Sequence, residues 1–184
     1  MPREIHMYDN TFPNKRFKHT VEFLKQHVDT SQSILDLGVE NPLSEILKSN
    51  GYSVENTSGI DLDVNTSEIE NSKNEVVTAF EIFEHLLSPF TVLKSIKANK
   101  LVASIPMRLW FSSAYRSKTD MRDRHYHEFE DWQFDWLLEK AGWKIIATEK
   151  WTNPTKKIGI RPILRWFKPR YYIVYAERVS NSKS

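Results

Sequence analysis

The chain has 184 residues, 40% of them hydrophobic, which is enough for one core but too short for two ordinary domains. Its 26 basic and 24 acidic residues nearly balance, which argues against a disordered chain and against a uniformly basic coat for nucleic acid. The absence of cysteine excludes disulfides, thiolate metal sites and cysteine nucleophiles. No apolar run approaches the roughly 18 residues of a membrane span and the N-terminus lacks a signal peptide's apolar stretch, so we expect a soluble cytoplasmic protein.

The charges are unevenly distributed along the chain. Residues 29–91 carry 2 basic and 12 acidic residues, whereas residues 92–184 carry 19 basic and 9 acidic ones. This asymmetry predicts two faces with different ligands, unless the charges intermix on folding.

The first half of the chain alternates between helical and strand patterns. A helix over about residues 14–27 is predicted by an apolar stripe of Phe17, Val21, Leu24 and Val28. Residues 33–38 form a short buried strand, and a second helix begins with an Asn41 cap and Pro42 and ends at Gly51. Short strands are then expected at residues 52–56 and 59–62.

The same alternation continues to the C-terminus. A strand at residues 75–80 precedes a helix opened by Ser88 and Pro89, whose inward face is predicted to be Phe90, Leu93 and Ile96. A strand at 101–105 is followed by a long polar loop and by a helix closed by Gly142. The last two strands, at 143–148 and 171–176, have no helical pattern between them and predict an antiparallel hairpin.

This order of elements predicts an α/β fold. Strands that alternate with amphipathic helices favour a Rossmann-like three-layer sandwich, with a mostly parallel sheet and an antiparallel C-terminal edge hairpin. Ligands bind such sheets at the carboxyl ends of the strands. We expect residues 1–179 to form one domain and residues 180–184 to be a flexible polar tail.

Four segments, in order, resemble class I S-adenosylmethionine-dependent methyltransferases, and most closely their small-molecule branch. They are residues 33–38 with the following helix, residues 76–89, residues 103–106, and the stretch from His127 to Trp143. The resemblance implies S-adenosylmethionine as cofactor and methyl transfer to an oxygen or nitrogen of a small or glycan/lipid-linked acceptor. The resemblance covers about residues 34–148.

The resemblance also implies a set of cofactor-binding residues: Asp36, Gly38, Glu40, Asn56, Asp61, Leu62, Phe80 and Glu81. Two positions depart from the family's Asp-x-Gly-x-Gly-x-Gly pattern, because Glu40 and Pro42 replace glycines, and Glu40 would lie where the methionine part of the cofactor is expected. Asn56, with Glu55 as an alternative, replaces the usual acidic ribose ligand. The stretch after it is too short for the usual intervening helix, so the domain is expected to be trimmed.

A histidine stands where the acceptor would enter. His85 can remove a proton from the acceptor near neutral pH, and His125 and His127 are alternatives. Glu81, Glu84 and His85 also look like the cluster that some quinone-pathway O-methyltransferases use for a divalent ion, but we predict no metal here. A structural role for His85 remains the alternative.

Two basic stretches predict the partners. The polar loop from residue 107 to 128 resembles the family's substrate lid, and Arg108, Tyr115, His125 and Tyr126 are its candidate contacts to an acidic or phosphorylated acceptor. The segment from Lys156 to Arg170 has six basic residues and no acidic one, which suggests contact with a membrane surface. A solvated loop and an ordinary connection between strands are the alternatives.

Two other functions remain open at this stage. Glu40, Pro42 and Asn56 are compatible with a non-catalytic methyltransferase-like binding module that has lost cofactor affinity. The basic second half is compatible with an RNA-associated methyltransferase, but the small net charge argues against it and no nucleic acid is expected.

Overall fold

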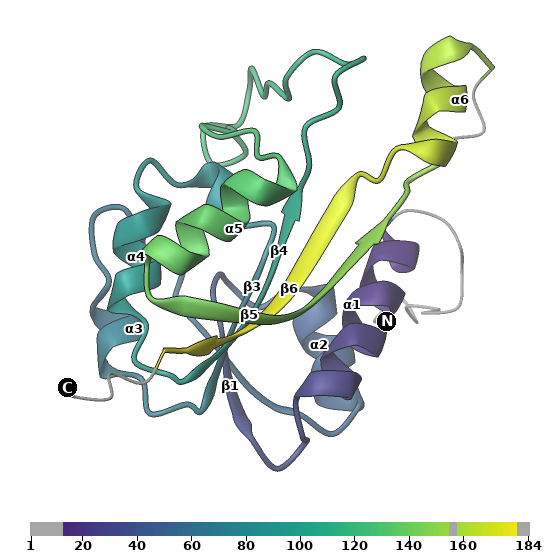
Figure 1. Cartoon of the computed structure of the whole chain (residues 1–184). Helices are drawn as coiled ribbons and strands as arrows, with labels where there is room; N and C mark the ends of the chain where they lie inside the picture. Colours follow the sequence, from purple (N-terminus) through teal and green to yellow (C-terminus); the bar gives the residue numbers. More distant parts are fainter. Residues whose placement is uncertain (1–12, 155–157, 180–184) are drawn as a thin grey trace.

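The computed structural model describes residues 13–154 and 158–179, and it confirms the predicted α/β architecture (Figure 1). Within this part of the chain one six-stranded sheet has the order β2-β1-β3-β4-β6-β5. The first four strands in chain order pair in parallel, and β6 is antiparallel to both β4 and β5. The strands are β1 (Ser33–Asp36), β2 (Ser53–Asn56), β3 (Val76–Phe80), β4 (Lys100–Pro106), β5 (Trp143–Trp151) and β6 (Tyr171–Arg178).

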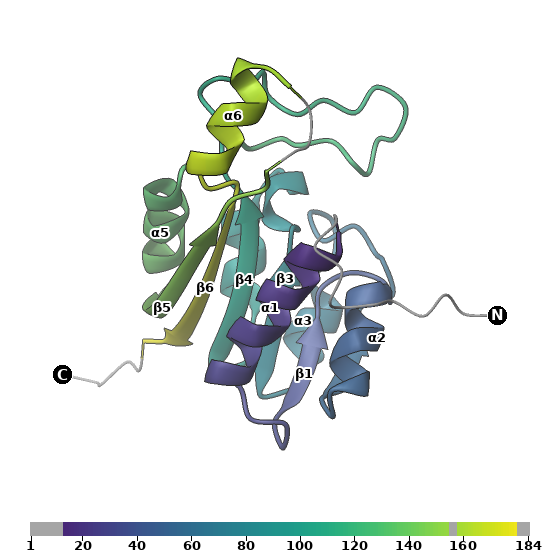
Figure 2. The same ribbon diagram turned by 90° about the vertical axis from the view of Figure 1, so that its right-hand side faces the viewer.

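Helices cover both faces of this sheet, as Figures 1 and 2 show. On one face lie α1 (Asn14–His27) and α2 (Pro42–Ser49), and on the other lie α3 (Ser67–Asn71), α4 (Pro89–Ser95) and α5 (Asp131–Lys140). A single 3-10 turn, η1 (Phe83–His85), follows β3, and α6 (Ile160–Phe167) stands beyond the carboxyl ends of the strands. The predicted tail at residues 180–184 lies outside the described residues, and the single-domain organisation stays a prediction.

Strand alternation divides the core into two layers. Ile34 of β1 and Val76 of β3 pack among the residues of α1 and α2, whereas Leu35 and Val77 pack among those of α4 and α5. Successive strand side chains point to opposite faces, so a strand buried on both sides must be apolar throughout. This explains why β3 and β4 are mostly apolar; their buried polar residues, Thr78 and Ser104, donate hydrogen bonds to Asp36 and Glu81.

The helix boundaries follow from local chemistry. The α1 helix has the predicted span, and the Asn41 side chain caps α2 by accepting hydrogen bonds from the amides of Leu43 at 2.9 Å and Ser44 at 3.3 Å. Pro42 occupies the first turn, where the N–H that it lacks would have no helical partner.

Three predicted details are wrong. Residues 59–62 form no strand, because the main-chain carbonyl of Asp61 accepts hydrogen bonds from the amides of Val64 and Asn65 and closes a turn. Phe90 of α4 is 40% exposed, because the helix turns Val92, Leu93 and Ile96 inward instead. The last two strands pair antiparallel as predicted, but α6 connects them where no helix was expected. The helix tolerates Pro162 because that residue lies in its first turn.

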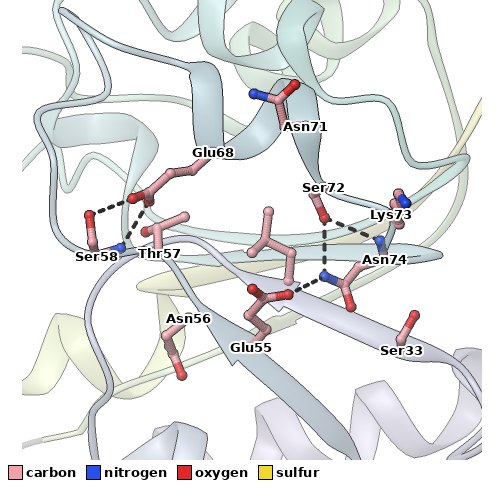
Figure 3. A pocket seen from close by; sticks show the side chains of 11 residues that line it. Ser33, Glu55, Asn56, Thr57, Ser58, Glu68, Asn71, Ser72, Lys73 and Asn74 are labelled. Atoms are coloured by element: carbon pink, nitrogen blue, oxygen red, sulfur yellow. Dashed lines mark hydrogen bonds between the residues drawn. The ribbon is translucent and has the colours of Figure 1, made fainter.

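The sheet ends at β2 on one side, because the strand expected at residues 59–62 does not form. The expected trimming concerned a helix between residues 55 and 59, and no helix occurs there. A polar cleft of about 590 Å³ runs between β2 and α3, as Figure 3 shows. Its hydrogen bonds join Glu68 to Ser58 and Asn74 to Glu55 and Ser72 (Figure 3). In the described part of the chain, no helix has both the length and the apolar character to cross a membrane.

Candidate functional site

The candidate site lies at the carboxyl ends of β1, β2, β3 and β4. The loops that follow these strands are residues 37–41, 57–66, 81–88 and 107–130, and parallel pairing brings them to one end of the sheet. The strand order reverses between β1 and β3, and ligands of open α/β sheets bind at such a reversal.

Asp36 organises the first loop from inside the protein. The side chain is 3% exposed, and its carboxylate accepts hydrogen bonds from Thr78 Oγ1 at 2.6 Å, Ser44 Oγ at 3.2 Å and Asn56 Nδ2 at 3.1 Å. Burial raises the pKa of Asp36 to about 6, although these hydrogen bonds oppose the rise. Asp36 therefore ties β1, α2, β2 and β3 together.

Asn56 donates hydrogen bonds to this network, whereas its side-chain oxygen has no partner among the described residues. Its Nδ2 donates to Asp36, to the Gly38 carbonyl at 3.3 Å and to Ser44 Oγ at 3.1 Å. Its Oδ1 is buried and has no hydrogen-bond partner among the described residues. Figure 3 shows the side chain turned away from Glu68 and Asn74, toward the other side of β2. Natural proteins rarely leave a buried acceptor unpaired, and a water, an ion or a ligand usually explains one that lacks a protein partner.

The loops after β1 and β2 lie directly on each other. Gly38 has φ +115°, and its N–H donates to Thr57 Oγ1 at 2.7 Å. Gly59 has φ +86°, and a Cβ atom there would lie 2.6 Å from Val39 Cγ1. Only glycine tolerates this backbone conformation together with this approach.

The side chains of Glu40 and Pro42 are both exposed, and neither is buried in the loop after β1. The Glu40 side chain is 57% exposed and forms an ion pair with Lys48 on α2. Pro42 is exposed at the start of the same helix. The loop has therefore replaced two glycines at positions whose side chains point outward.

The loop after β2 is built around two aspartates. The Asp61 side chain accepts a hydrogen bond from the Asp63 amide at 3.0 Å, and Asp63 in turn accepts from the amides of Leu87 at 2.7 Å and Ser88 at 2.8 Å. Leu62, between them, is 8% exposed and belongs to the core. Asp61 is exposed beside the first loop, whereas Leu62 and Asp63 position the backbone.

Glu81 pairs with a residue that the sequence did not single out. Its carboxylate lies 3.3 Å from the Arg16 guanidinium of α1 and accepts a hydrogen bond from Ser104 Oγ at 3.1 Å. Burial raises the pKa of Glu81, and the Arg16 charge opposes that rise. Its φ of 58° is unusual for a residue other than glycine and marks a constrained turn after Phe80, which is partly buried.

Glu84, His85 and His125 form a second cluster. Glu84 is 1% exposed, and burial, followed by the charge of Glu81, raises its pKa well above the usual value. The Glu84 carbonyl accepts hydrogen bonds from the amides of Tyr126 at 2.8 Å and His127 at 3.2 Å, which anchors the 107–130 loop. Glu84 Oε2 is buried without a hydrogen-bond partner among the described residues.

The His85 ring is oriented by the same loop. His85 Nδ1 lies 3.0 Å from the Arg124 carbonyl oxygen, which can only accept, so Nδ1 donates to it. The other ring nitrogen, Nε2, lies 3.7 Å from Glu84 Oε1. The His125 ring meets His85 edge-on at 4.7 Å between ring centres. Burial, followed by the proximity of His85, lowers the pKa of His125 to about 4. Ligand atoms of Glu84, His85 and His125 lie within 4.8 Å of one another, a set able to hold a divalent ion.

The 107–130 loop forms a basic cavity next to these histidines. The cavity has a volume of about 540 Å³ and is lined by Tyr115, Arg116, Ser117, Lys118, Arg124, His125 and Tyr126. Its lining thus includes three cations and no carboxylate. Tyr115, Tyr126 and His125 come together there as predicted contacts, whereas Arg108 lies at the base of the loop, where its amide donates to the Phe129 carbonyl at 2.8 Å.

Comparison with known proteins gives a match at the level of structure only. No family model and no curated protein matches the chain. A putative methyltransferase of Haloferax volcanii, solved with the Trm112 methyltransferase activator, is 9% identical over 92% of both chains with a TM-score of 0.60.

Two further matches have comparable scores. A SAM-dependent methyltransferase of Methanosarcina mazei is 14% identical over 85% of this chain and 97% of its own, with a TM-score of 0.61. The magnesium protoporphyrin IX methyltransferase of Synechocystis, solved with bound SAM, is 12% identical over 94% and 88%, with a TM-score of 0.57. The chain therefore has the class I SAM-dependent methyltransferase fold.

Proposed function

We propose that this protein transfers a methyl group from S-adenosylmethionine to an oxygen or nitrogen of an anionic small or glycan/lipid-linked acceptor. The observation that carries the proposal is the buried, unpartnered Asn56 Oδ1 beside the Asp36–Gly38 turn. In this fold that position faces the nucleoside, and an acceptor atom there fits a ribose hydroxyl.

The residues present fit the cofactor. Asn56 would hold the ribose beside Gly38, the exposed Asp61 would lie nearby in the loop after β2, and Glu40 would leave the space free by turning toward Lys48. Asp36 would not contact the cofactor directly, because its carboxylate already accepts hydrogen bonds from Thr78, Ser44 and Asn56. When bound, S-adenosylmethionine supplies an activated methyl group on a sulfonium.

The chain's own contribution to such a reaction is alignment and proton removal. In-line displacement on a sulfonium depends mainly on holding the acceptor oxygen or nitrogen in line with the methyl group. His85 Nε2 can accept the proton of the acceptor, because the Arg124 carbonyl fixes the proton on Nδ1. His125 stays neutral at pH 7, because its pKa is about 4, so it does not repel a cationic His85 after proton transfer.

The charge of the acceptor is inferred from the loop cavity. Arg116, Lys118 and Arg124 line it without a carboxylate, and it adjoins His85 through His125. Guanidinium groups recognise phosphate and carboxylate with paired hydrogen bonds. We therefore place a phosphate or carboxylate of the acceptor in this cavity.

The first test of the proposal is binding of S-adenosylhomocysteine to the full chain, measured by calorimetry. The Asn56→Ala variant should bind about fivefold more weakly, because one hydrogen bond contributes about 1 kcal/mol. Asn74→Ala is the matched control, because Asn74 bonds Glu55 and Ser72 in the cleft beside α3, whereas the Asn56 side chain is turned away from them toward Asp36.

The outcomes separate the candidate functions. Binding by the wild-type chain that Asn56→Ala weakens and Asn74→Ala leaves unchanged supports the cofactor site. No binding at millimolar ligand would reject it and favour a non-catalytic module.

A further inference from the structure

The α6 helix is an amphipathic helix with several largely exposed apolar side chains. None of its residues is buried, and its exposed fractions reach 79% for Ile160, 57% for Ile163, 60% for Trp166 and 79% for Phe167. Exposed apolar residues normally occur singly, so a cluster of four on two helical turns marks an interaction surface.

The basic side chains of α6 are arranged beside this apolar cluster. Arg161 and Arg165 are one helical turn apart, Lys168 follows, and residues 158–176 contain no acidic residue. Arg165 and Arg170 line a small cavity of about 100 Å³ together with residues of the 107–130 loop. The helix therefore rests on that loop through its Arg165 side, and Ile160, Ile163 and Phe167 remain exposed.

The loop extends the same kind of surface. Trp110 is 71% exposed and Met121 70%, and the same loop carries the exposed cations Arg116, Lys118 and Arg122. Its carboxylates, which include Asp120 and Asp123, are fewer than its basic residues. Figures 1 and 2 show α6 and this loop together at one end of the molecule, beyond the carboxyl ends of the strands. This is also the end that holds the basic cavity and His85.

We propose that α6 and the 107–130 loop dock on an anionic lipid bilayer, with the basic cavity opening toward the lipid. Apolar side chains of an interfacial helix insert into the headgroup region while Lys and Arg bind anionic headgroups. The inference rests on the proposed function for its second half: the methyl acceptor is then carried by a lipid with a negatively charged headgroup. Lys156 belongs to the same basic segment but lies outside the described residues.

Charge and shape favour a bilayer over the alternatives. Nucleic acid would be bound by the cations alone and would leave Ile160, Ile163 and Phe167 in water. A second copy of this chain would have to cover the apolar cluster while opposing the same cations, which repel each other. An anionic bilayer satisfies both kinds of side chain at once.

The test is co-sedimentation of the full chain with vesicles of phosphatidylcholine alone or with an equal amount of phosphatidylglycerol. We expect binding to the mixed vesicles, weakened at least tenfold by Ile163→Glu and about fivefold or more by Arg161→Glu, since each basic residue contributes about 1 kcal/mol. Trp136→Glu is the matched control, because Trp136 is 64% exposed on α5, away from this surface. All three side chains are exposed, and unchanged melting temperatures verify that the variants fold.

Each outcome decides the proposal. Equal loss in Trp136→Glu and Ile163→Glu, or no binding to mixed vesicles, overturns it. Dimerisation that Ile163→Glu abolishes, without vesicle binding, assigns the face to a second copy, and binding of RNA oligonucleotides without vesicle binding assigns it to nucleic acid. Calorimetry with S-adenosylhomocysteine is separate: vesicle binding without cofactor binding keeps the docking surface and rejects the methyl transfer.

Discussion

Replacing Asp36 by asparagine should change how the stability of the protein depends on pH. In the folded chain burial raises the pKa of Asp36 to about 6, whereas the usual value is 3.8. The folded state therefore holds the proton more tightly, so the contribution to stability is complete below pH 3.8 and is lost as the pH rises through 6. The interval between the two pKa values corresponds to about 3 kcal/mol in total.

Urea denaturation can measure the accessible part of this effect. Between pH 5 and pH 8 the linkage relation gives a loss of about 1.4 kcal/mol from Asp36 in the wild-type chain. The difference in free energy of unfolding between Asp36→Asn and the wild type should therefore change by this amount between pH 5 and pH 8. Any effect of the substitution on hydrogen bonding that is independent of pH does not alter this change. Other titrating groups, including Glu81 and Glu84, cancel in that difference. The exposed Asp61→Asn serves as control, and a difference for Asp36→Asn that is independent of pH would refute the reasoning.

Three further predictions concern the site. Gly59→Ala should destabilise the fold by about 2 kcal/mol or more in urea denaturation and weaken S-adenosylhomocysteine binding, because its Cβ would lie 2.6 Å from Val39 Cγ1. Gly142→Ala is the control: its Cβ would meet only Arg178, at 3.9 Å, so it should cost about 1 kcal/mol. His85→Ala should slow methyl transfer about 10²- to 10⁴-fold with unchanged cofactor affinity, and unaltered turnover once an acceptor is known would exclude it as the base. Glu40→Ala should change cofactor affinity less than about threefold in calorimetry, because the side chain is turned to Lys48 in a surface ion pair, and a large gain would show that Glu40 obstructs the site.

The sequence by itself determined the layers and most element boundaries. The helical stripe from Phe17 to Val28, the Asn41 cap and the apolar runs of β3 and β4 depend on interactions within a few residues, so the printed order contains them. The hairpin of β5 and β6 was predictable for the same reason. The helix α6 was not predicted from the sequence, because it has no buried apolar face and because Pro162, near its start, looks like a helix breaker.

Only the tertiary structure decided the site. The pairing of Glu81 with Arg16 joins side chains 65 positions apart, the bond from Thr78 to Asp36 spans 42, and the contact of His85 with the Arg124 carbonyl spans 39. The orientation of the Glu40 side chain depends on its ion pair with Lys48, on the following helix α2. Hydrogen bonds and desolvation act over a few ångströms in space, whatever the distance along the chain, so the chemistry of these residues appears only once the strands have paired.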